Sequence, residues 1–492
     1  MHVVRCVSNS REPYSQYAID TAQNHGRDGF ARTRVVHAAQ ASQLPNTACP
    51  CTAPNSLKFG IMDVRSKHEA MLRWLLGIPN FTDVQYKAVL RVLSGKNTFV
   101  IAGTGAGKSA IAQYAALVSC GIAVVITPYV AIAADQVQQL RSVGVPAAVL
   151  GEDDGLFFGG ERPLGVAYTT PESVNGGYAQ KRIAMFAAAG ALRLVAIDEV
   201  HEVLVHGRTF RPSMAKLPRA LENVAPAAPL LLLTATAPRT VLRRAHTAFG
   251  MGPRDMLRAP LDRPNLGYEV TEVPQKDPGN TICMCCGTGC FLCLSFIPRL
   301  AHVQGRALLY TATRAGAAAA AAAFRRFGVR AGSYHAEMCR ADRALVHAQW
   351  TAGALRVVCC TKAFSTGVHT PDIALVFHES APLEAVQFAQ EAGRGGRDGR
   401  PCRSVVVYDA GQHNRAIALA WRSASEARAR GDHAAAVAVH DMLVTAEAMR
   451  TFCTTTRCRR RVLLSAMCSP LGYWVPTRWC CDNCHCNGML HQ

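Results

Sequence analysis

A glycine-rich segment of the sequence has the residue types that bind phosphate groups. It reads Gly103-Thr-Gly-Ala-Gly-Lys-Ser109 and lies between an apolar run, Thr98 to Ile101, and a helix-prone run, Ala110 to Val118. Glycines let successive backbone N–H groups converge on one anion, and the N-terminus of a following helix adds partial positive charge. Lys108 supplies a full positive charge, and the Ser109 hydroxyl suits the Mg²⁺ that accompanies nucleotide phosphates. The residues expected to bind the nucleotide phosphates are Gly103, Thr104, Gly105, Ala106, Gly107, Lys108 and Ser109.

Two adjacent carboxylates provide groups for hydrolysis. Asp198 and Glu199 follow the apolar run Leu194 to Ile197, which predicts a buried strand that ends in acidic side chains. Open parallel sheets bind their ligands at the carboxyl ends of the strands. At that position Asp198 can hold Mg²⁺ through its water shell, and Glu199 can act as general base toward the attacking water. The pattern predicts hydrolysis of a nucleoside triphosphate.

A pair of arginines follows much later in the chain. The segment Gln390-Glu-Ala-Gly-Arg-Gly-Gly-Arg-Asp-Gly399 places Arg394 and Arg397 three residues apart, and we expect both guanidinium groups on one turn. Planar donors that are always charged match phosphoryl oxygens as negative charge builds in the transition state. Taken alone, a run rich in glycine and arginine also fits a basic RNA-binding loop.

The elements that must position these groups are predicted from the hydrophobic pattern. Short apolar runs alternate with helix-length segments, which is typical of a parallel α/β sheet. The stretch from Ser109 to Ala134 has no charged residue and is long enough to cross a membrane. Polar and helix-breaking residues interrupt it at Ser119, Gly121, Thr127 and Pro128. We therefore expect helix, turn, buried strand and loop there, and no membrane association.

The composition indicates an acidic partner and a reducing environment. The 492 residues leave room for about three domains, at roughly 150 residues each. Lys and Arg total 53 against 34 Asp and Glu, giving a net charge of +19. This excess favours nucleic acid as a partner, although a merely solvated basic surface is the alternative. The 20 cysteines cluster in two places and no signal-peptide pattern opens the sequence, which favours intracellular thiols and a metal site.

In their order, these motifs resemble those of the RecQ-type superfamily 2 DNA helicases. The resemblance extends from Phe81 to about Cys484, and it implies two tandem RecA-like α/β lobes with parallel sheets, followed by a small helical zinc-binding module. It implies that Gln85 reads the adenine of ATP through its amide. It also implies that Lys108, Asp198 and Glu199 bind ATP and Mg²⁺ on one lobe, while the arginine pair closes on the nucleotide from the other.

Further segments resemble parts of the family that contact DNA. Thr127 to Val137 and Ala167 to Ser173 in the first lobe, and Ala331 to Met338 in the second, are similar to backbone-gripping segments. Leu230 to Pro238 resembles the segment that links the state of the bound ATP to lobe closure. Phe364 to Ile373 resembles the loop that bridges DNA and nucleotide. The resemblance implies ATP-dependent 3′-to-5′ translocation on DNA and unwinding of single-stranded and forked substrates. It further implies a role in DNA repair or recombination in the nucleus.

Three substitutions in the segments that would connect DNA and nucleotide depart from the family pattern. In the loop His201 to Pro212, which resembles the family's aromatic-rich loop, His206 replaces a tryptophan and Glu202 a cysteine. His369 stands where the family carries an acidic residue. An imidazole offers a smaller stacking face than an indole. We therefore expect weaker coupling between DNA binding and hydrolysis.

The second cysteine cluster resembles the family's zinc site. Cys458 is followed by two arginines, and Cys481-Asp-Asn-Cys484 closes the motif, so Cys458, Cys481 and Cys484 are implied as zinc ligands. Arg478 occupies the usual position of the fourth. The candidates for the fourth ligand are Cys468, Cys480 and Cys486. The alternative is a set of reduced cysteines in a flexible tail.

The predicted domains are a first lobe over 61–262, a second over 263–410 and the helical zinc module over 411–492. Residues 1–60 show no sustained apolar period and are expected to be poorly ordered. Five cysteines lie within 283–293, and four of them form two C-x2-C pairs only three residues apart, which fits a soft-metal site or, better, an insertion without metal. The winged helix that follows the zinc module in RecQ relatives has no counterpart here, so we expect a short form.

Three other functions remain possible on this sequence. One is a DNA-stimulated translocase, or an RNA-directed ATPase, that does not separate strands. Another is a degenerate nucleic-acid-binding copy with weak or no ATPase activity. The third is a zinc-stapled interaction protein, which requires the phosphate loop to be coincidental. The response of ATP hydrolysis to single-stranded DNA distinguishes them.

Overall fold

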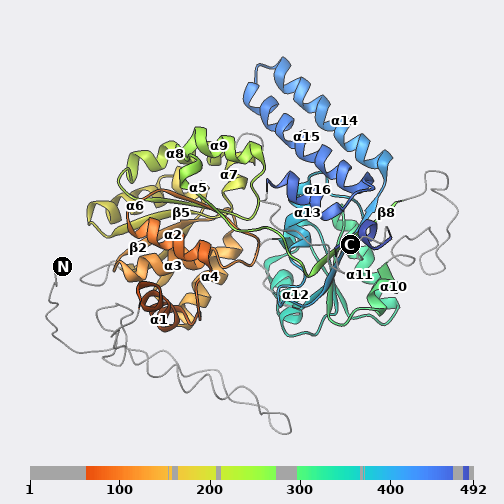
Figure 1. The fold of residues 1–492 in the computed structure, drawn as a ribbon, viewed down its shortest axis with the longest axis horizontal. Coiled ribbons are helices and arrows are strands. Elements are labelled where there is room, and N and C mark those ends of the chain that lie inside the picture. Colours follow the sequence, from red (N-terminus) through yellow and green to blue (C-terminus); the bar gives the residue numbers. More distant parts are fainter. Residues whose placement is uncertain are drawn as a thin grey trace, which may run out of the picture. The chain divides into compact units, whose positions relative to one another are not determined.

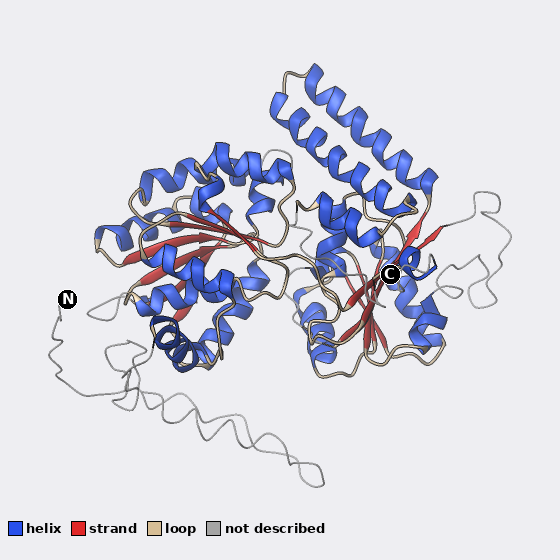
Figure 2. Cartoon of the chain, viewed as in Figure 1, coloured by secondary structure: helices blue, strands red, loops and turns tan. Residues whose placement is uncertain are grey.

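The computed structural model describes residues 63–152, 155–157, 164–206, 212–272, 296–365, 370, 372–468 and 480–486. They form two parallel sheets, each covered by helices (Figures 1 and 2). We call the sheets with their helices the first and second lobe. The two-lobed parallel fold expected from the sequence is confirmed. The predictions made for 1–60, for 283–293 and for His369 concern residues outside the described part.

The first lobe has seven strands in the order β3-β4-β2-β5-β6-β1-β7. The strands are β1 (Thr98–Ile101), β2 (Ile122–Ile126), β3 (Ala147–Val149), β4 (Gly165–Thr169), β5 (Leu192–Ile197), β6 (Leu230–Thr234) and β7 (Met256–Arg258). Side chains along a strand alternate between the two faces of its sheet. Phe99 and Ile101 therefore enter one core and Val100 the other. Both faces are apolar, so helices must cover both.

Within the described residues, four helices cover the face on which Val100 lies, and five cover the opposite face. The first group is α1 (Val64–Leu76), α2 (Asp83–Leu93), α3 (Ser109–Val118) and α4 (Val130–Ser142). The second group is α5 (Pro171–Asn175), α6 (Tyr178–Ala188), α7 (Val200–His206), α8 (Pro212–Val224) and α9 (Arg239–Phe249). The phosphate loop joins β1 to α3 and thus lies at the carboxyl end of the sheet, as predicted.

The second lobe has six strands in the order β10-β11-β9-β12-β13-β8. The strands are β8 (Leu266–Glu272), β9 (Arg306–Tyr310), β10 (Ala331–Tyr334), β11 (Val357–Cys360), β12 (Ile373–His378) and β13 (Cys402–Tyr408). One face packs against α10 (Ile297–Ala301) and α11 (Arg314–Arg326). The alanine-rich sequence predicts a helix where α11 forms, and Ala317, Ala321 and Phe324 bury its inner face.

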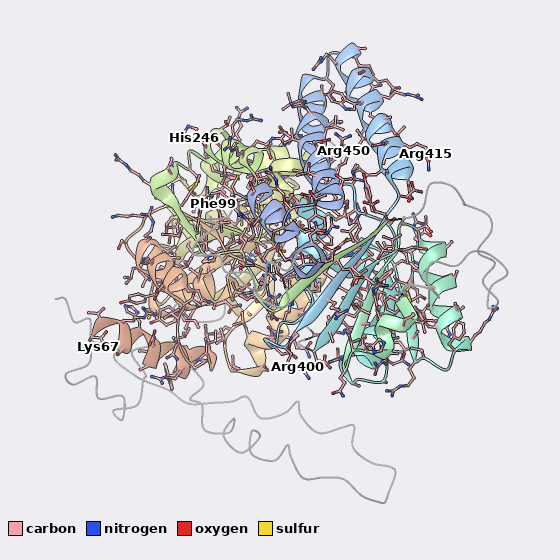
Figure 3. All side chains as sticks on the ribbon, turned by 45° about the vertical axis from the view of Figure 1, so that its right-hand side comes forward. Lys67, Phe99, His246, Arg400, Arg415 and Arg450 are labelled. Atoms are coloured by element: carbon pink, nitrogen blue, oxygen red, sulfur yellow. The ribbon has the colours of Figure 1, made fainter. Side chains whose placement is uncertain are left out.

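The other face of this sheet packs against α12 (Arg340–Thr351), α13 (Ala385–Ala392) and the C-terminal helices. The C-terminal helices are α14 (Ala410–Ala429), α15 (His433–Thr454), α16 (Arg459–Ala466) and α17 (Asp482–Cys486). Met449 and Phe452 of α15 share one apolar cluster with Val376 of β12. Arg415 and Arg450 are exposed on the hairpin of α14 and α15 (Figure 3). The C-terminal helices therefore complete the core of the second lobe.

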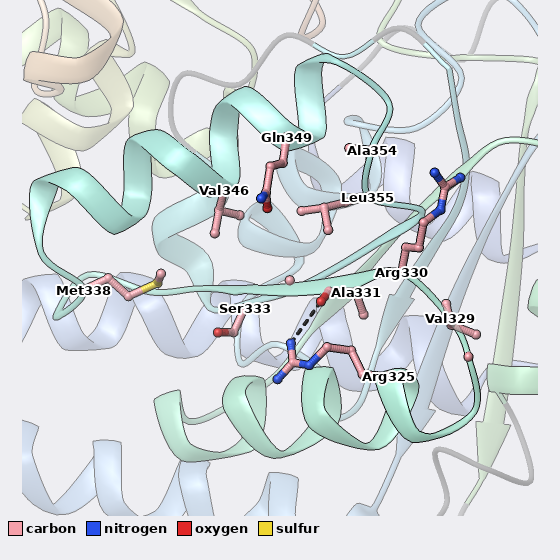
Figure 4. Close-up of a pocket in the computed structure, with 12 residues that line it drawn as sticks. Arg325, Val329, Arg330, Ala331, Ser333, Met338, Val346, Gln349, Ala354 and Leu355 are labelled. Carbon is pink, nitrogen blue, oxygen red and sulfur yellow. Dashed lines mark hydrogen bonds between the residues drawn. The ribbon is translucent and has the colours of Figure 1, made fainter.

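A hollow of about 620 Å³ lies between α11, β10 and α12 (Figure 4). Val346, Leu355 and Met338 contribute apolar surface, and Arg325 donates to the Ala331 carbonyl beside it at 3.0 Å. None of the residues predicted to bind nucleotide or metal lines it. Among the described helices, none is both long and apolar enough to cross a membrane.

Candidate nucleotide site

The phosphate loop has the backbone conformation that its glycines permit. Gly105 and Gly107 have φ values of 84° and 67°, in the left-handed region that L side chains rarely adopt. A Cβ on Gly107 would also lie 2.6 Å from Nε2 of Gln85. Lys108 is 9% exposed, and its Nζ donates to the carbonyls of Ala102 at 2.9 Å and Gly103 at 3.3 Å. The ammonium group is thus held at the loop.

Gln85 lies on α2 and is hydrogen-bonded to the same loop. Its Nε2 donates to the carbonyls of Ala106 and Gly107, both at 3.0 Å, while its Oε1 accepts from the Thr82 backbone at 2.8 Å. Thr82 and Gln85 together form the capping box at the start of α2. The structure brings Gln85 to the site, and its adenine-reading role remains a prediction.

Asp198 and Glu199 lie directly after β5, where the sequence predicts them. The backbone N–H of Asp198 donates to the Ile126 carbonyl of β2 at 2.9 Å, which fixes the turn. Glu199 has a φ of 46°, a strained conformation for a residue with a side chain. Desolvation and then the charge of Glu199 raise the pKa of Asp198 to about 6. Carboxylate oxygens suit Mg²⁺, so the residues here fit the ion.

His201 stands between two carboxylates. Its Nδ1 lies 3.3 Å from Oε2 of Glu199 and its Nε2 3.6 Å from Oε1 of Glu202, while the imidazole is 3% exposed. Burial disfavours the charged imidazole, but contacts with Glu199 and then Glu202 prevail and raise its pKa to about 10. In return, although burial opposes the shift, the nearby imidazole of His201 and the charges of Lys108 and Arg394 lower the pKa of Glu199 to about 2. Sequence reasoning assigned no role to His201.

The arginine pair comes from the second lobe. α13 ends at Ala392, so Arg394 and Arg397 lie in the turns after the helix. A Cβ on Gly105 would lie 3.9 Å from Cδ and Nε of Arg397, which places Arg397 against the phosphate loop. Burial and then the charges of Arg394 and Arg263 lower the pKa of Arg397 to about 9.

One buried nitrogen of this pair is suited to bind an anion. Nη2 of Arg397 is buried and has no hydrogen-bond partner within the described residues. A buried guanidinium nitrogen without an acceptor is costly, and a phosphate oxygen would satisfy it. The residues from both lobes therefore fit a nucleoside triphosphate.

Gln390 connects this segment to the carboxylate pair. Its Nε2 lies 2.7 Å from Nε2 of His201. A protonated imidazole donates from both ring nitrogens, so the amide must then present its oxygen to the ring. The contact links His201 of the first lobe to the segment that carries Arg394.

Four thiols lie together where the sequence predicts a metal site. The sulfurs of Cys458, Cys480, Cys481 and Cys484 all lie within 4.8 Å of one another and all four residues are buried. Sulfurs of a tetrahedral zinc site are about 3.8 Å apart, since each Zn–S bond is about 2.3 Å. The set fits zinc, and it favours Cys480 as the fourth ligand. Cys468 lies outside this group.

Arg459 and Arg460, which follow Cys458, connect the thiol cluster to the rest of the chain by hydrogen bonds. Arg459 donates to Oδ1 of Asp482 at 2.6 Å, and Arg460 to Oδ1 of Asp262 at 2.6 Å and to the Arg263 carbonyl at 2.7 Å. The Tyr268 N–H of β8 also donates to the Cys480 carbonyl at 3.2 Å. The thiol cluster thus lies at the β8 edge of the second lobe, a position that the spacing of the cysteines did not reveal.

Two of the segments expected to contact DNA lie at the carboxyl ends of neighbouring strands. β2 pairs with β4 in parallel, and the segments Thr127 to Val137 and Ala167 to Ser173 include or follow their carboxyl ends. Of the aromatic-rich loop, residues 207–211 lie outside the described part. DNA contact by any of these segments remains a prediction.

Two family patterns match the chain. The DEAD/DEAH box helicase pattern matches residues 82–244, and the helicase conserved C-terminal domain matches residues 292–399. Together they include the phosphate loop, the carboxylate pair and the arginine pair.

Named relatives are about 30% identical to the chain over roughly two thirds of its length. A putative ATP-dependent DNA helicase Q1 from Caenorhabditis briggsae is 31% identical over 344 residues, covering 67% of this chain and 53% of that protein. ATP-dependent DNA helicase Q1 from Rattus norvegicus is 30% identical over 364 residues, covering 70% of this chain and 55% of that protein. ATP-dependent helicase SGS1 from Saccharomyces cerevisiae is 30% identical over 345 residues, covering 67% of this chain and 23% of that protein. The chain spans about half the length of the Q1 relatives.

Solved structures share the fold. Mycobacterium smegmatis helicase Lhr, bound to ssDNA and AMP-PNP, aligns with a TM-score of 0.56 at 19% identity, covering 80% of this chain and 58% of Lhr. S. cerevisiae Dbp5, bound to RNA and ADP BeF3, aligns with a TM-score of 0.54 at 15% identity, covering 70% of this chain and 88% of Dbp5. At such identities the likeness concerns the fold alone.

Proposed function

Because the chain belongs to the RecQ family of superfamily 2 helicases, we propose that it is an ATP-dependent DNA helicase that moves 3′ to 5′ along one strand and separates the duplex. The names of the relatives support ATP and DNA as its ligands. The net charge of +19 favours a polyanionic partner. A role in repair or recombination, and residence in the nucleus, are parts of the same proposal.

The observation that carries the proposal is the position of Arg397 against the phosphate loop. Its side chain comes from the second lobe, whereas the loop that it contacts near Gly105 belongs to the first. Its buried Nη2 lacks an acceptor among the described residues, and the γ-phosphate of ATP would provide one. A nucleotide bound there stabilises the closed arrangement of the lobes, and its hydrolysis removes that stabilisation.

The residues of the site divide the chemistry among them. Lys108 and the loop N–H groups bind the phosphates, and Gln85 is proposed to read the adenine. Ser109 and Asp198 would hold Mg²⁺, which neutralises phosphate charge when bound. Glu199, kept ionised by His201, orients the attacking water and receives its proton. Arg394 and Arg397 stabilise the charge that develops on the transferred phosphoryl group.

Lobe closure provides a means of movement. Segments proposed to grip the DNA backbone lie on both lobes, at Thr127 to Val137 in the first and Ala331 to Met338 in the second. Alternate closing and opening would then advance the lobes along the strand in turn. The thiol cluster, with zinc, would fix the β8 edge and the C-terminal helices, because in such modules metal affinity contributes folding free energy.

A forked-duplex assay tests the proposal. Unwinding of a duplex with a 3′ single-stranded tail, dependent on ATP and absent with a 5′ tail, is the expected result. Lys108→Ala should abolish it. ATP hydrolysis that single-stranded DNA does not stimulate, together with no unwinding, would overturn the helicase proposal and favour a degenerate binding copy.

A second candidate is a translocase that hydrolyses ATP on nucleic acid without strand separation. Glu202 replaces a cysteine of the family pattern, and it contacts His201 at 3.6 Å and accepts from the Tyr129 hydroxyl at 2.9 Å. The substitution thus changes the link between the catalytic carboxylates and the aromatic-rich loop. Stimulated hydrolysis without unwinding, measured with DNA and with RNA in parallel, would favour this candidate.

A further inference from the structure

A buried glutamine joins three elements of the first lobe. Gln113 lies on α3, the helix that begins at Ser109, and it is 8% exposed. Its Nε2 lies 2.8 Å from Oε1 of Gln136 on α4 and 3.2 Å from Oη of Tyr168 on β4. Neither bond involves a residue assigned to ATP hydrolysis. A single amide therefore bridges the phosphate-loop helix to two separate elements.

The two partners of Gln113 lie in the first-lobe segments proposed to grip DNA. Gln136 belongs to Thr127 to Val137, and Tyr168 to Ala167 to Ser173. Tyr168 pairs with Val125 of β2, the strand between β4 and β5. Burial raises the pKa of the Tyr168 phenol, the bond from Gln113 opposes this and the charge of Asp198 adds to it. Tyr168 is thus within electrostatic reach of the hydrolysis site as well.

Gln113 lies close to the end of α3 that adjoins the phosphate loop. Residues four apart lie on the same face of a helix, so Gln113 is one turn beyond Ser109 on the same side. Phosphate binding acts on the N-terminus of α3, and the helix transmits a displacement to Gln113 as a rigid element. Leaving a buried amide donor unpaired costs free energy, so α3, α4 and β4 favour arrangements that keep both bonds.

We propose that Gln113 is a positioning residue that couples nucleotide binding at the phosphate loop to nucleic-acid binding by α4 and the end of β4. This inference rests on the proposed function, since it requires hydrolysis stimulated by nucleic acid. Gln113 touches neither the reacting atoms nor the phosphates. Its loss should affect communication between the two sites rather than hydrolysis itself.

Steady-state hydrolysis with and without single-stranded DNA tests the proposal. Gln113→Met removes the amide but keeps an unbranched side chain of similar size. We expect hydrolysis without DNA to stay within about twofold of wild type, while stimulation by DNA falls roughly five- to tenfold, the range of a typical coupling free energy. Gln304→Met, at an exposed position outside the segments proposed to bind nucleotide or nucleic acid, is the matched control and should behave as wild type.

Reciprocity provides a second readout that a merely structural role would not change. The factor by which AMP-PNP alters the affinity for single-stranded DNA must equal the factor by which the DNA alters affinity for AMP-PNP. Fluorescence anisotropy with labelled single-stranded DNA should show that Gln113→Met reduces this factor. Tyr168→Phe should reduce it too, and the double variant should show less than the product of the two effects because the residues share one network.

The outcomes separate this inference from the proposed function. Loss of stimulation with retained DNA-independent hydrolysis supports the inference. An equal proportional loss of both rates, or wild-type stimulation in Gln113→Met, overturns it while leaving the helicase proposal intact. Absence of stimulation in the wild-type protein overturns the proposed function and the inference together.

Discussion

Nδ1 of His201 lies 3.3 Å from Oε2 of Glu199, and the imidazole is almost completely buried. The contact keeps a histidine charged where burial would favour its neutral form. It also holds the carboxylate beside the phosphate loop ionised. The pair is therefore both a stabilising interaction and a part of the proposed hydrolysis site.

This pair predicts a pH-dependent contribution to stability. The pKa of His201 is raised from 6.5 to about 10, so the stabilisation is complete below pH 6.5 and is lost as the pH rises toward 10. His201→Gln should lower stability by about 2 kcal/mol or more at pH 6, as expected for breaking a buried pair, and by much less at pH 10. Thermal unfolding at both pH values measures the difference. His246→Gln, at an exposed position, should show no such trend.

Removal of the phosphate-loop lysine should stop ATP turnover. Lys108 is held at the loop by bonds to the Ala102 and Gly103 carbonyls, so its charge is in place before nucleotide binds. Lys108→Ala should lower kcat at least about a hundredfold, because an electrostatic contact to the transition state is lost. Phosphate release in the presence of DNA measures it. Lys96→Ala, at an exposed position, should retain turnover, and equal turnover in wild type and Lys108→Ala would refute the assigned role.

Arg397 should act on turnover more than on nucleotide binding. Its guanidinium lies against the phosphate loop with one buried nitrogen lacking an acceptor within the described chain. Arg397→Ala should lower kcat by roughly a thousandfold, as for other arginines that contact a transferred phosphoryl group. Arg397→Lys should recover little, since an ammonium cannot reproduce the planar fork.

The matched control for Arg397 is Arg400→Ala. Arg400 is exposed and pairs with Asp398 at 2.6 Å. We expect its loss to leave kcat unchanged. A similar decrease in kcat in both variants would show that any change in this segment impairs turnover. That result would contradict a specific role for Arg397.

Metal content should identify the fourth zinc ligand. We expect one zinc per chain, held by Cys458, Cys480, Cys481 and Cys484. Cys480→Ser should lower the zinc content and the melting temperature, whereas Cys468→Ser should leave both unchanged. Elemental analysis of the folded protein measures the zinc, and its absence from folded wild type would disprove the site.

Arg460 should be required for stability rather than for chemistry. It is 2% exposed and donates to Asp262 and to the carbonyls of Arg263 and Leu266, so its loss leaves two carbonyls and a carboxylate without their donor. Arg460→Lys should lower the free energy of unfolding by about 3 kcal/mol. Denaturant titration measures it. Arg461→Lys, at an exposed position, should be nearly neutral, and equal effects would contradict the role assigned to Arg460.

The sequence alone determined the two-lobed parallel fold and several residues of the candidate nucleotide site. Continuous apolar runs predicted strands buried on both faces, and the runs Thr98 to Ile101 and Leu194 to Ile197 lie in β1 and β5. Lys108, Asp198 and Glu199 could be found because each follows a strand in a local motif. Local patterns of this kind depend on residues near in the chain, which is why one sequence suffices to find them.

Only the tertiary structure decided which distant residues meet. The structure favoured Cys480 among the candidates for the fourth thiol. It also brought Arg460 to Asp262, and Gln113 to Gln136 and Tyr168, although no spacing in the sequence links these partners. The charge of His201 likewise depends on burial and on two carboxylates held around it. Such contacts arise when packing brings separate elements together, so hydrogen-bond geometry and burial, rather than residue type, determine them.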